Sequence, residues 1–180
     1  SDAAQLDVAT VSITNANYGL YIFGSDPTVT LSGVDITGTV RSAVDVNDSA
    51  SDVTLNNVVI DGAGEIVVAA SGYLGELRIN GRSVSGASSG RPGVQVSGSE
   101  ALEQGGTLYV QGTQIVNNLG YGLQVNDFAT ADVRNASISN NAVEGVSSFE
   151  PAALLLRDTT VQFNERTNPP RSDLRRSRTP

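Results

Sequence analysis

The sequence predicts an all-β fold, a right-handed single-stranded parallel β-helix of about seven coils. An eight-residue pattern occurs seven times, and its starts are 23, 24, 24, 31, 23 and 23 residues apart. A fixed period in this range is typical of solenoid proteins. Within each copy, apolar residues alternate as they do in a strand. Gly and Asn return at the same place after each copy, where the chain has to turn.

The first element of each repeat is a pair of short strands joined by a bend. In the second copy Val29 and Leu31 alternate, one extra residue intervenes, and Val34 and Ile36 then alternate in the same way. Side chains two apart on a strand face one side, so these four residues are expected to point inward. The copies start at Leu6, Val29, Val53, Leu77, Leu108, Ala131 and Leu154.

A third strand is expected about fifteen residues after each start. Its inward pairs are Leu20 and Ile22, Val44 and Val46, Val67 and Ala69, Val94 and Val96, Leu123 and Val125, and Val146 with Ser148. The residues between these pairs should then point outward: Tyr21, Asp45, Val68, Gln95, Gln124 and Ser147. Coils stacked about 4.8 Å apart would pair each strand with the next coil and close one apolar column.

The turn after the second strand has its own residue type. Asn or Gly stands two places after the last apolar residue of that strand in six copies, and both tolerate a left-handed backbone. These residues are Asn15, Gly38, Gly62, Gly86, Asn117 and Asn140. Stacked Asn side chains at these positions are expected to hydrogen-bond from coil to coil, as in amide ladders.

The LxLxxVxI cores, the Asn or Gly turn and segments such as IVNNLGYGLQV (115–125) and ISNNAVEGV (138–146) resemble the parallel β-helix repeats of the pectin-lyase-like superfamily. The resemblance covers roughly residues 6–164. It implies the fold more sharply than the function, because this architecture hosts lyases, hydrolases, adhesins, phage tail spikes and inert surface proteins.

Enzymes of this kind carry motifs that the chain lacks. Polygalacturonase-like members have NTD, a paired Asp, a Gly-His and an R-x-K segment, and this chain has no His, no Lys, no NTD and no adjacent Asp pair. Pectate-lyase-like members use acidic Ca²⁺ ligands with an Arg as base on the outer face of the third strand and its neighbours. Only Asp45 is acidic among the outward residues there, whereas a glycosidase needs two carboxyls about 5–10 Å apart.

Composition narrows the chemistry further. The chain contains no Cys and no His, which excludes disulfides, thiolate metal sites, the commonest general base and the commonest metal ligand. Its Ser and Thr residues therefore lack a familiar activating base. The sequence assigns no catalytic, cofactor-binding or metal-ligating residue, and we expect a protein that is not an enzyme.

Acidic residues gather in or beside the turns after the third strand. They are Asp26, Asp48, Asp52, Asp127 and Asp132. One interpretation is a Ca²⁺ site, because Ca²⁺ takes carboxylate and carbonyl oxygens. The other is turn chemistry, because Asp and Asn hydrogen-bond their own backbone in turns. The spacing matches neither the EF-hand loop nor the nonapeptide repeat.

Two insertions lengthen the fourth repeat, residues 86–93 and residues 97–106. Insertions in a solenoid emerge as loops and often lie on the binding face. They flank the strand that carries Gln95. With Arg82, Arg91, Tyr73 and Gln124 they are expected to form a shallow polar groove for a sugar chain. The alternative is that these loops simply tolerate insertion.

Charge separates two regions. Residues 1–164 hold six Arg and seventeen acids, a net charge of −11, and residues 165–180 hold five Arg and two acids, a net charge of +3. An acidic body does not suit nucleic acid, and no apolar run is long enough to span a bilayer. We expect a β-helix over 1–164, a fragment of a longer solenoid with flanking domains or further coils, and a disordered Arg/Pro-rich tail over 165–180.

These observations predict a structural or adhesive module of a secreted or surface-attached bacterial protein, with a polysaccharide or cell-surface glycan as its partner. Two alternatives stay open. One is a fragment of a polysaccharide lyase or hydrolase whose catalytic coil lies elsewhere. The other is a phage tail-spike segment, which would form trimers.

Overall fold

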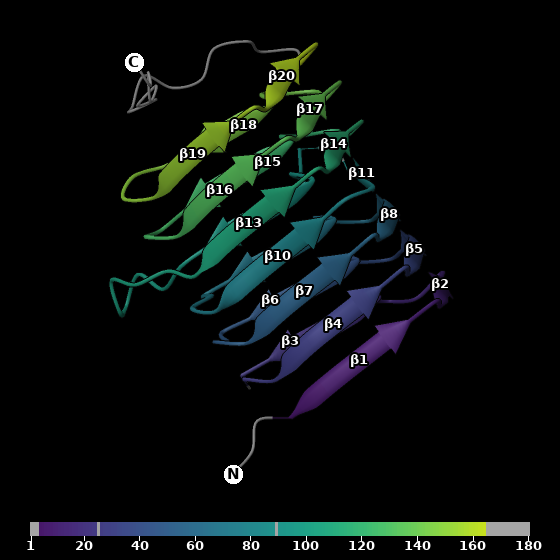
Figure 1. Ribbon diagram of the computed structural model, residues 1–180. Coiled ribbons are helices and arrows are strands. Elements are labelled where there is room, and N and C mark those ends of the chain that lie inside the picture. Colours follow the sequence, from purple (N-terminus) through teal and green to yellow (C-terminus); the bar gives the residue numbers. More distant parts are fainter. Residues whose placement is uncertain (1–3, 25, 89, 165–180) are drawn as a thin grey trace.

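The computed structural model describes residues 4–24, 26–88 and 90–164, and the regular elements found there are β-strands. They form three parallel sheets, named A, B and C here, and each coil adds one strand to each sheet (Figure 1). Sheets A and B have seven strands and sheet C has six, so the chain makes about six complete turns. The predicted parallel β-solenoid is confirmed.

Sheet A consists of β1 (Gln5–Ala9), β4 (Thr28–Ser32), β7 (Asp52–Asn56), β10 (Glu76–Asn80), β13 (Thr107–Gln111), β16 (Thr130–Arg134) and β19 (Ala153–Arg157). Sheet B consists of β2 (Ser12–Thr14), β5 (Asp35–Thr39), β8 (Val59–Ala63), β11 (Ser83–Ala87), β14 (Gln114–Val116), β17 (Ser137–Ser139) and β20 (Thr160–Gln162). Sheet C consists of β3 (Leu20–Phe23), β6 (Val44–Asn47), β9 (Val68–Ser71), β12 (Val94–Ser97), β15 (Leu123–Asn126) and β18 (Val146–Ser148).

The core is one apolar column along the solenoid axis. Alternating residues of the inner coils bury Val, Leu and Ile side chains of all three sheets in a single cluster, whereas Leu6 of β1 and Val161 of β20 are exposed. Val29, for instance, stacks on Val53 in sheet A, and Ile36 stacks on Ile60 in sheet B. Each such side chain contributes about 1.5–3 kcal/mol when fully buried, so stacking supplies the core that a single coil lacks.

The bends are fixed by residues in the left-handed region. The predicted column after the second strand is confirmed, because each of its six residues has a positive φ, from 54° at Asn15 to 79° at Gly86. A second column of such residues separates sheet A from sheet B and includes Gly33 and Gly112. Gly adopts this conformation without steric cost and Asn with little, which explains their recurrence at these places.

An amide ladder exists, but one residue later than predicted. The exposed turn residues Asn117 and Asn140 do not form it. Their successors do: Asn118 Nδ2 donates to Asn141 Oδ1, and Asn141 Nδ2 donates to Asn164 Oδ1, each at 2.9 Å. All three ladder side chains are buried. The left-handed residue points its own side chain to solvent and turns the next one inward, which the spacing alone did not reveal.

Glycines that directly precede strands of sheet C make room for this ladder. A Cβ on Gly93 would meet the side chain of Asn118, and a Cβ on Gly145 would meet that of Asn164, at 2.4 and 2.5 Å respectively. Distances under 3.0 Å cannot be accommodated without a shift. The ladder and the glycine before each third strand are therefore one packing unit.

The third strand of the third coil is displaced by one residue from the prediction. Val68 and Ala70 point inward and pair with Val44 and Val46, so Ala69 rather than Val68 takes the outward place. Residues 67–70 read VVAA, an unbroken apolar run. Such a run shows no alternation, and periodicity cannot fix its facing side.

Two further expectations concern the C-terminal tail and membrane-spanning segments. The predicted disordered tail over 165–180 falls outside the described residues. Among the residues that are described, no helix is long and apolar enough to cross a membrane.

Candidate functional site

The outer face of sheet C carries two of the side chains predicted for the groove, Gln95 and Gln124. Strand pairing places its central outward column in the order Tyr21, Asp45, Ala69, Gln95, Gln124 and Ser147. Four coil steps of about 4.8 Å put Tyr21 and Gln124 about 19 Å apart along the axis. The face therefore runs from an aromatic end, past small side chains, to a pair of stacked amides.

The two insertions flank this face at β12, as predicted. Residues 86–93 enter β12, and residues 97–106 leave it. In the first loop, the Gly90 N–H donates to the Leu119 carbonyl of the next coil at 3.0 Å. In the second loop, Ser99 and Gln104 form an antiparallel bridge, with the Ser99 N–H donating to the Gln104 carbonyl at 2.7 Å. The second loop is a small exposed hairpin.

Two residues of the predicted groove lie elsewhere. Tyr73 is fully buried in the apolar column, where its hydroxyl donates to the Ser51 carbonyl at 2.6 Å. Burial raises the pKa of the Tyr73 hydroxyl far above its ordinary value. Arg82 occupies the bend between β10 and β11, with its guanidinium 3.7 Å from the Asp35 carboxylate. Both residues lie away from the predicted groove because neither belongs to a strand of sheet C.

Three residues of the predicted groove remain: Gln95, Gln124 and Arg91. Gln95 and Gln124 are register partners on β12 and β15, and both are half-buried on the outer face. Arg91 is exposed in the first loop. Close to the second loop, Asn126 Oδ1 is a buried oxygen that accepts no hydrogen bond from any described group. A buried acceptor without a donor costs free energy, so the Asn126 side chain destabilises the fold at this point unless it gains a donor.

At the other end of the same face lies a group that sequence reasoning did not single out. We call it the tyrosine cluster, and it consists of Tyr18, Tyr21, Arg41, Asp45 and Asn47. The rings of Tyr18 and Tyr21 are 4.8 Å apart at an interplanar angle of 33°. The Arg41 guanidinium donates to the Tyr18 hydroxyl at 3.2 Å and lies 6.0 Å from the centre of that ring.

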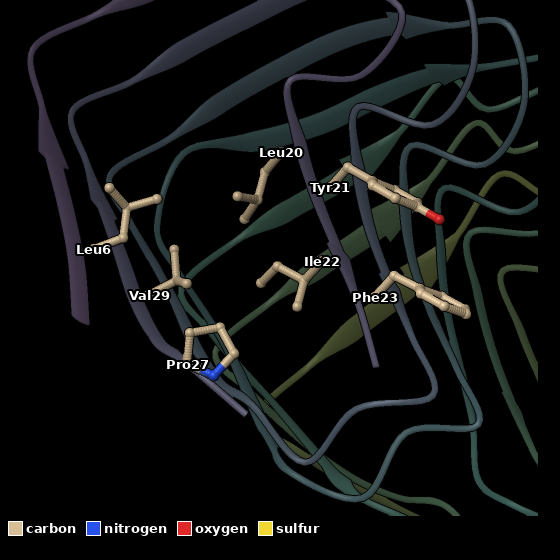
Figure 2. Close-up of a pocket in the computed structure, with 7 residues that line it drawn as sticks. All are labelled: Leu6, Leu20, Tyr21, Ile22, Phe23, Pro27 and Val29. Atoms are coloured by element: carbon tan, nitrogen blue, oxygen red, sulfur yellow. The ribbon is translucent and has the colours of Figure 1, made fainter. Parts of the chain in front are cut away.

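Figure 2 shows how β3 presents this aromatic end. Tyr21 and Phe23 point away from the solenoid, whereas Leu20 and Ile22 point into it, toward Leu6 and Val29. Tyr21 is 52% exposed and Phe23 is 61% exposed. The inward side of β3 lines an open pocket of about 400 Å³ at the end of the apolar column. Tyr21 and Phe23 are also among the residues that line this pocket, so the pocket and the aromatic platform adjoin one another at β3.

Asp45 is the charged residue at the centre of the tyrosine cluster. It is an outward residue, yet only 9% of its surface is exposed. The Asn47 side chain donates to its carboxylate at 2.5 Å. Burial raises the pKa of Asp45, the nearby Glu65 adds to this rise, and Asn47 and Arg41 oppose it. The carboxyl is thus held in place by the Asn47 amide, on the residue that pairs in register with Tyr21.

A local concentration of aromatic residues in the sequence indicates the tyrosine cluster. The chain contains five Tyr and four Phe, and three of these nine aromatic residues fall within the six residues YGLYIF at 18–23. Two of them alternate with the inward pair of β3 and so had to point outward. The partners Arg41 and Asp45 follow one coil later, at the spacing of the repeat.

The five aspartates considered for Ca²⁺ are not brought together. Asp26 accepts from the Ala50 N–H at 3.0 Å, and Asp52 accepts from the Glu76 N–H at 3.1 Å. The Asp127 carboxylate accepts from the Ser97 hydroxyl. Across the described ranges, no three acidic side chains meet in a way that could hold a metal ion. These partners lie on the neighbouring coil, so in these contacts the three carboxylates link successive coils and do not bond the backbone of their own turn.

The outer face of sheet A carries charges that pair locally. Asp132 accepts two hydrogen bonds from the Arg134 guanidinium, which lowers the pKa of the Asp132 carboxyl. Arg78 lies over the Tyr109 ring with 4.2 Å between the guanidinium carbon and the ring centre, and it also pairs with Glu76. The charged groups on the outer face of sheet A therefore pair with one another. At the aromatic end of sheet C, by contrast, Tyr21 is exposed.

The fold defines the class of this protein, a parallel β-solenoid, and sheet C carries a strip of outward residues in which Tyr21, Gln95 and Gln124 are accessible and Asp45, Ala69 and Ser147 are buried. No protein-family model, curated protein or solved structure matches the chain.

Proposed function

We propose that this chain is a structural or adhesive solenoid module that binds a polysaccharide along the outer face of sheet C. The observation that carries the proposal is the strip itself. Aromatic rings, amides and hydroxyls are the groups that bind sugars, since rings contact the apolar faces of a pyranose and polar groups pair with its hydroxyls.

The rigidity of the scaffold supports the same proposal. The central outward residues of sheet C stand between buried inward neighbours, as Gln95 stands between Val94 and Val96 and Gln124 between Leu123 and Val125. Side chains on such strands need little ordering when a ligand binds, which lowers the entropic cost of association. The two loops at β12 add side walls to the strip.

The finer identity of the module is part of the proposal. The repeat cores that resemble the pectin-lyase-like superfamily support a right-handed coil and a kinship with that superfamily. A bacterial protein that is secreted or attached to the cell surface would meet polysaccharides in this way. The regular repeats and the sequence without His, Lys or Cys favour binding over catalysis.

Affinity electrophoresis in gels that contain soluble polysaccharides tests the proposal. The panel includes neutral chains (dextran, galactomannan, xyloglucan) and acidic chains (alginate, polygalacturonate). We expect at least one polysaccharide to retard the protein. A variant without residues 99–104 removes the tip of the second loop and should weaken this retardation. Tyr109→Ala, on the outer face of sheet A, is the matched control and should migrate like the parent.

Three results would contradict the proposal. Migration unchanged by every polysaccharide would remove glycan binding. Release of reducing or unsaturated sugars during the same incubation would favour the lyase or hydrolase alternative. A trimer in size-exclusion chromatography with light scattering would favour the tail-spike alternative.

A further inference from the structure

In the tyrosine cluster the ring of Tyr21 is exposed beside fixed polar groups, whereas Tyr18 is half-buried. Tyr109, the comparison on sheet A, is half-buried and has Arg78 over its ring. Tyr21, by contrast, keeps 52% of its surface exposed although Tyr18 lies beside it. Phe23, two residues on and on the same side of β3, is also exposed, and adjoining exposed aromatic side chains are typical of interaction sites.

The polar groups around Tyr21 are held in position. Asp45 is the register partner of Tyr21 on the neighbouring strand, one coil away. Its carboxylate is fixed by the Asn47 amide, which sits two residues on and faces the same side. Arg41 is fixed in turn by the Tyr18 hydroxyl. A flat apolar ring, an acceptor and a set of donors are therefore presented within one coil step of each other.

This combination suits a sugar ring better than an apolar peptide. The C–H face of a pyranose packs on an aromatic ring, and the hydroxyls around its edge donate to carboxylates and accept from guanidinium or amide N–H groups. An apolar peptide side chain would bury Asp45 and Arg41 further without giving either a partner, and that costs free energy.

Charge selects between sugars. The tyrosine cluster holds one cation, Arg41, near the carboxylates of Asp45 and Glu65; its hydrogen bond to Tyr18 raises the pKa of Arg41 and both carboxylates add to this rise. The body that surrounds it, residues 1–164, carries a net charge of −11. A uronic acid or sulfated sugar would meet repulsion from this field, whereas an uncharged hexose would not.

We infer that the tyrosine cluster is a subsite for a neutral hexopyranose unit, with Tyr21 as the stacking platform and Asp45 as the acceptor for sugar hydroxyls. This inference rests on the proposed function, because it assigns one end and one ligand class to the proposed strip on sheet C. Beyond the cluster, strand register continues the outward column through Ala69, which is buried, to Gln95 and Gln124.

Three substitutions test the subsite in affinity electrophoresis with dextran, galactomannan, xyloglucan, alginate and polygalacturonate. We expect retardation by a neutral polysaccharide. Tyr21→Ala should weaken it about tenfold, as expected when an aromatic contact is lost. Tyr21→Phe keeps the ring and should bind like the parent. Asp45→Asn removes the charge with little change of shape and should weaken binding several-fold. Circular dichroism of each variant checks that the fold is kept.

The outcomes separate the subsite from the proposed function. Retardation by a neutral polysaccharide that Tyr21→Ala does not change, but that loss of residues 99–104 abolishes, would overturn the subsite and leave the proposed function standing. Retardation by acidic polysaccharides alone would overturn the neutral ligand class. Retardation by none of the five would overturn both.

Discussion

Replacing Asn141 by Ala is expected to destabilise the solenoid by about 4 kcal/mol. The Asn141 side chain is buried and takes part in four hydrogen bonds. Its Oδ1 accepts from the N–H and from Nδ2 of Asn118, and its Nδ2 donates to Asn164 Oδ1 and to the Ile115 carbonyl. A net contribution of about 1 kcal/mol for each bond gives the total. A loss of this size is a large part of the 5–15 kcal/mol that holds a typical domain together.

The control is the preceding residue. Asn140 is exposed and has a φ of 56°, and Gly occupies the equivalent turn position in the second, third and fourth coils. Asn140→Gly keeps the left-handed backbone accessible and removes no ladder contact. We therefore expect its free energy of unfolding to stay within about 0.5 kcal/mol of the parent.

Urea denaturation followed by circular dichroism measures both variants. The linear extrapolation gives the free energy of unfolding, and an unchanged slope shows that the same surface is exposed on unfolding. A value for Asn141→Ala within about 1 kcal/mol of the parent would refute the argument that the ladder stabilises the coil stack. An equal loss in Asn140→Gly would assign the effect to the turn instead of the ladder.

Three further predictions concern the core and the outer face. Val133→Asp places a carboxylate in the apolar column, where Val133 is fully buried, and should lower the melting temperature by about 10 °C or more. The control Gln111→Asp changes an exposed residue and should shift the melting temperature by less than about 2 °C. Equal melting temperatures for the two variants would contradict the core assignment. Tyr73→Phe removes the hydrogen bond to Ser51 and should lower the free energy of unfolding by about 1 kcal/mol. Tyr73→Ala leaves a cavity and should lower it by about 3–5 kcal/mol. Similar urea midpoints for the two variants would contradict a buried ring. The raised pKa of Asp45 means that the folded chain binds this proton more tightly than the unfolded chain, so its contribution makes stability fall as pH rises from the ordinary carboxyl pKa through the raised one. Asp45→Asn should consequently gain melting temperature over the parent as pH rises from 3 to 7, and a difference that is constant with pH would show that burial does not govern this carboxyl.

Most of the fold could be predicted because the repeat constrains it many times over. Seven copies of one alternation leave a single way to stack the strands, and the Gly or Asn after Ile36 and Ile60 marks the turn without help from distant contacts. The failures occur where the alternation disappears. VVAA at 67–70 is apolar at every position, so the facing side was set by the pairing with Val44 and Val46 and not by the sequence pattern.

The ladder was displaced for a related reason. Asn117 and Asn118 are adjacent and identical in type, and only the backbone conformation decides which of the two side chains turns inward. The same holds for Asn140 and Asn141. A sequence shows that an amide belongs in the turn, whereas the direction of each amide follows from φ and from the glycine against which it packs.

The candidate site could be predicted only in part. Gln95, Gln124 and the two loops at β12 follow from the lengthened fourth repeat. Tyr73 does not, because its place in the column depends on how Gly106 packs against its ring, a contact between residues far apart in the sequence. The tyrosine cluster likewise joins Tyr18 and Arg41 across a separation of 23 residues, one coil, which becomes a contact only once the coils are stacked.

The most direct test of the account is a crystal structure of this chain with an oligosaccharide cut from the polysaccharide that retards it most. We predict a chain of sugar rings on the outer face of sheet C, with one ring on Tyr21 and its hydroxyls within hydrogen-bonding distance of Asp45, extending toward Gln95. Sugar bound to sheet A or sheet B, with the face of sheet C empty, would contradict the account.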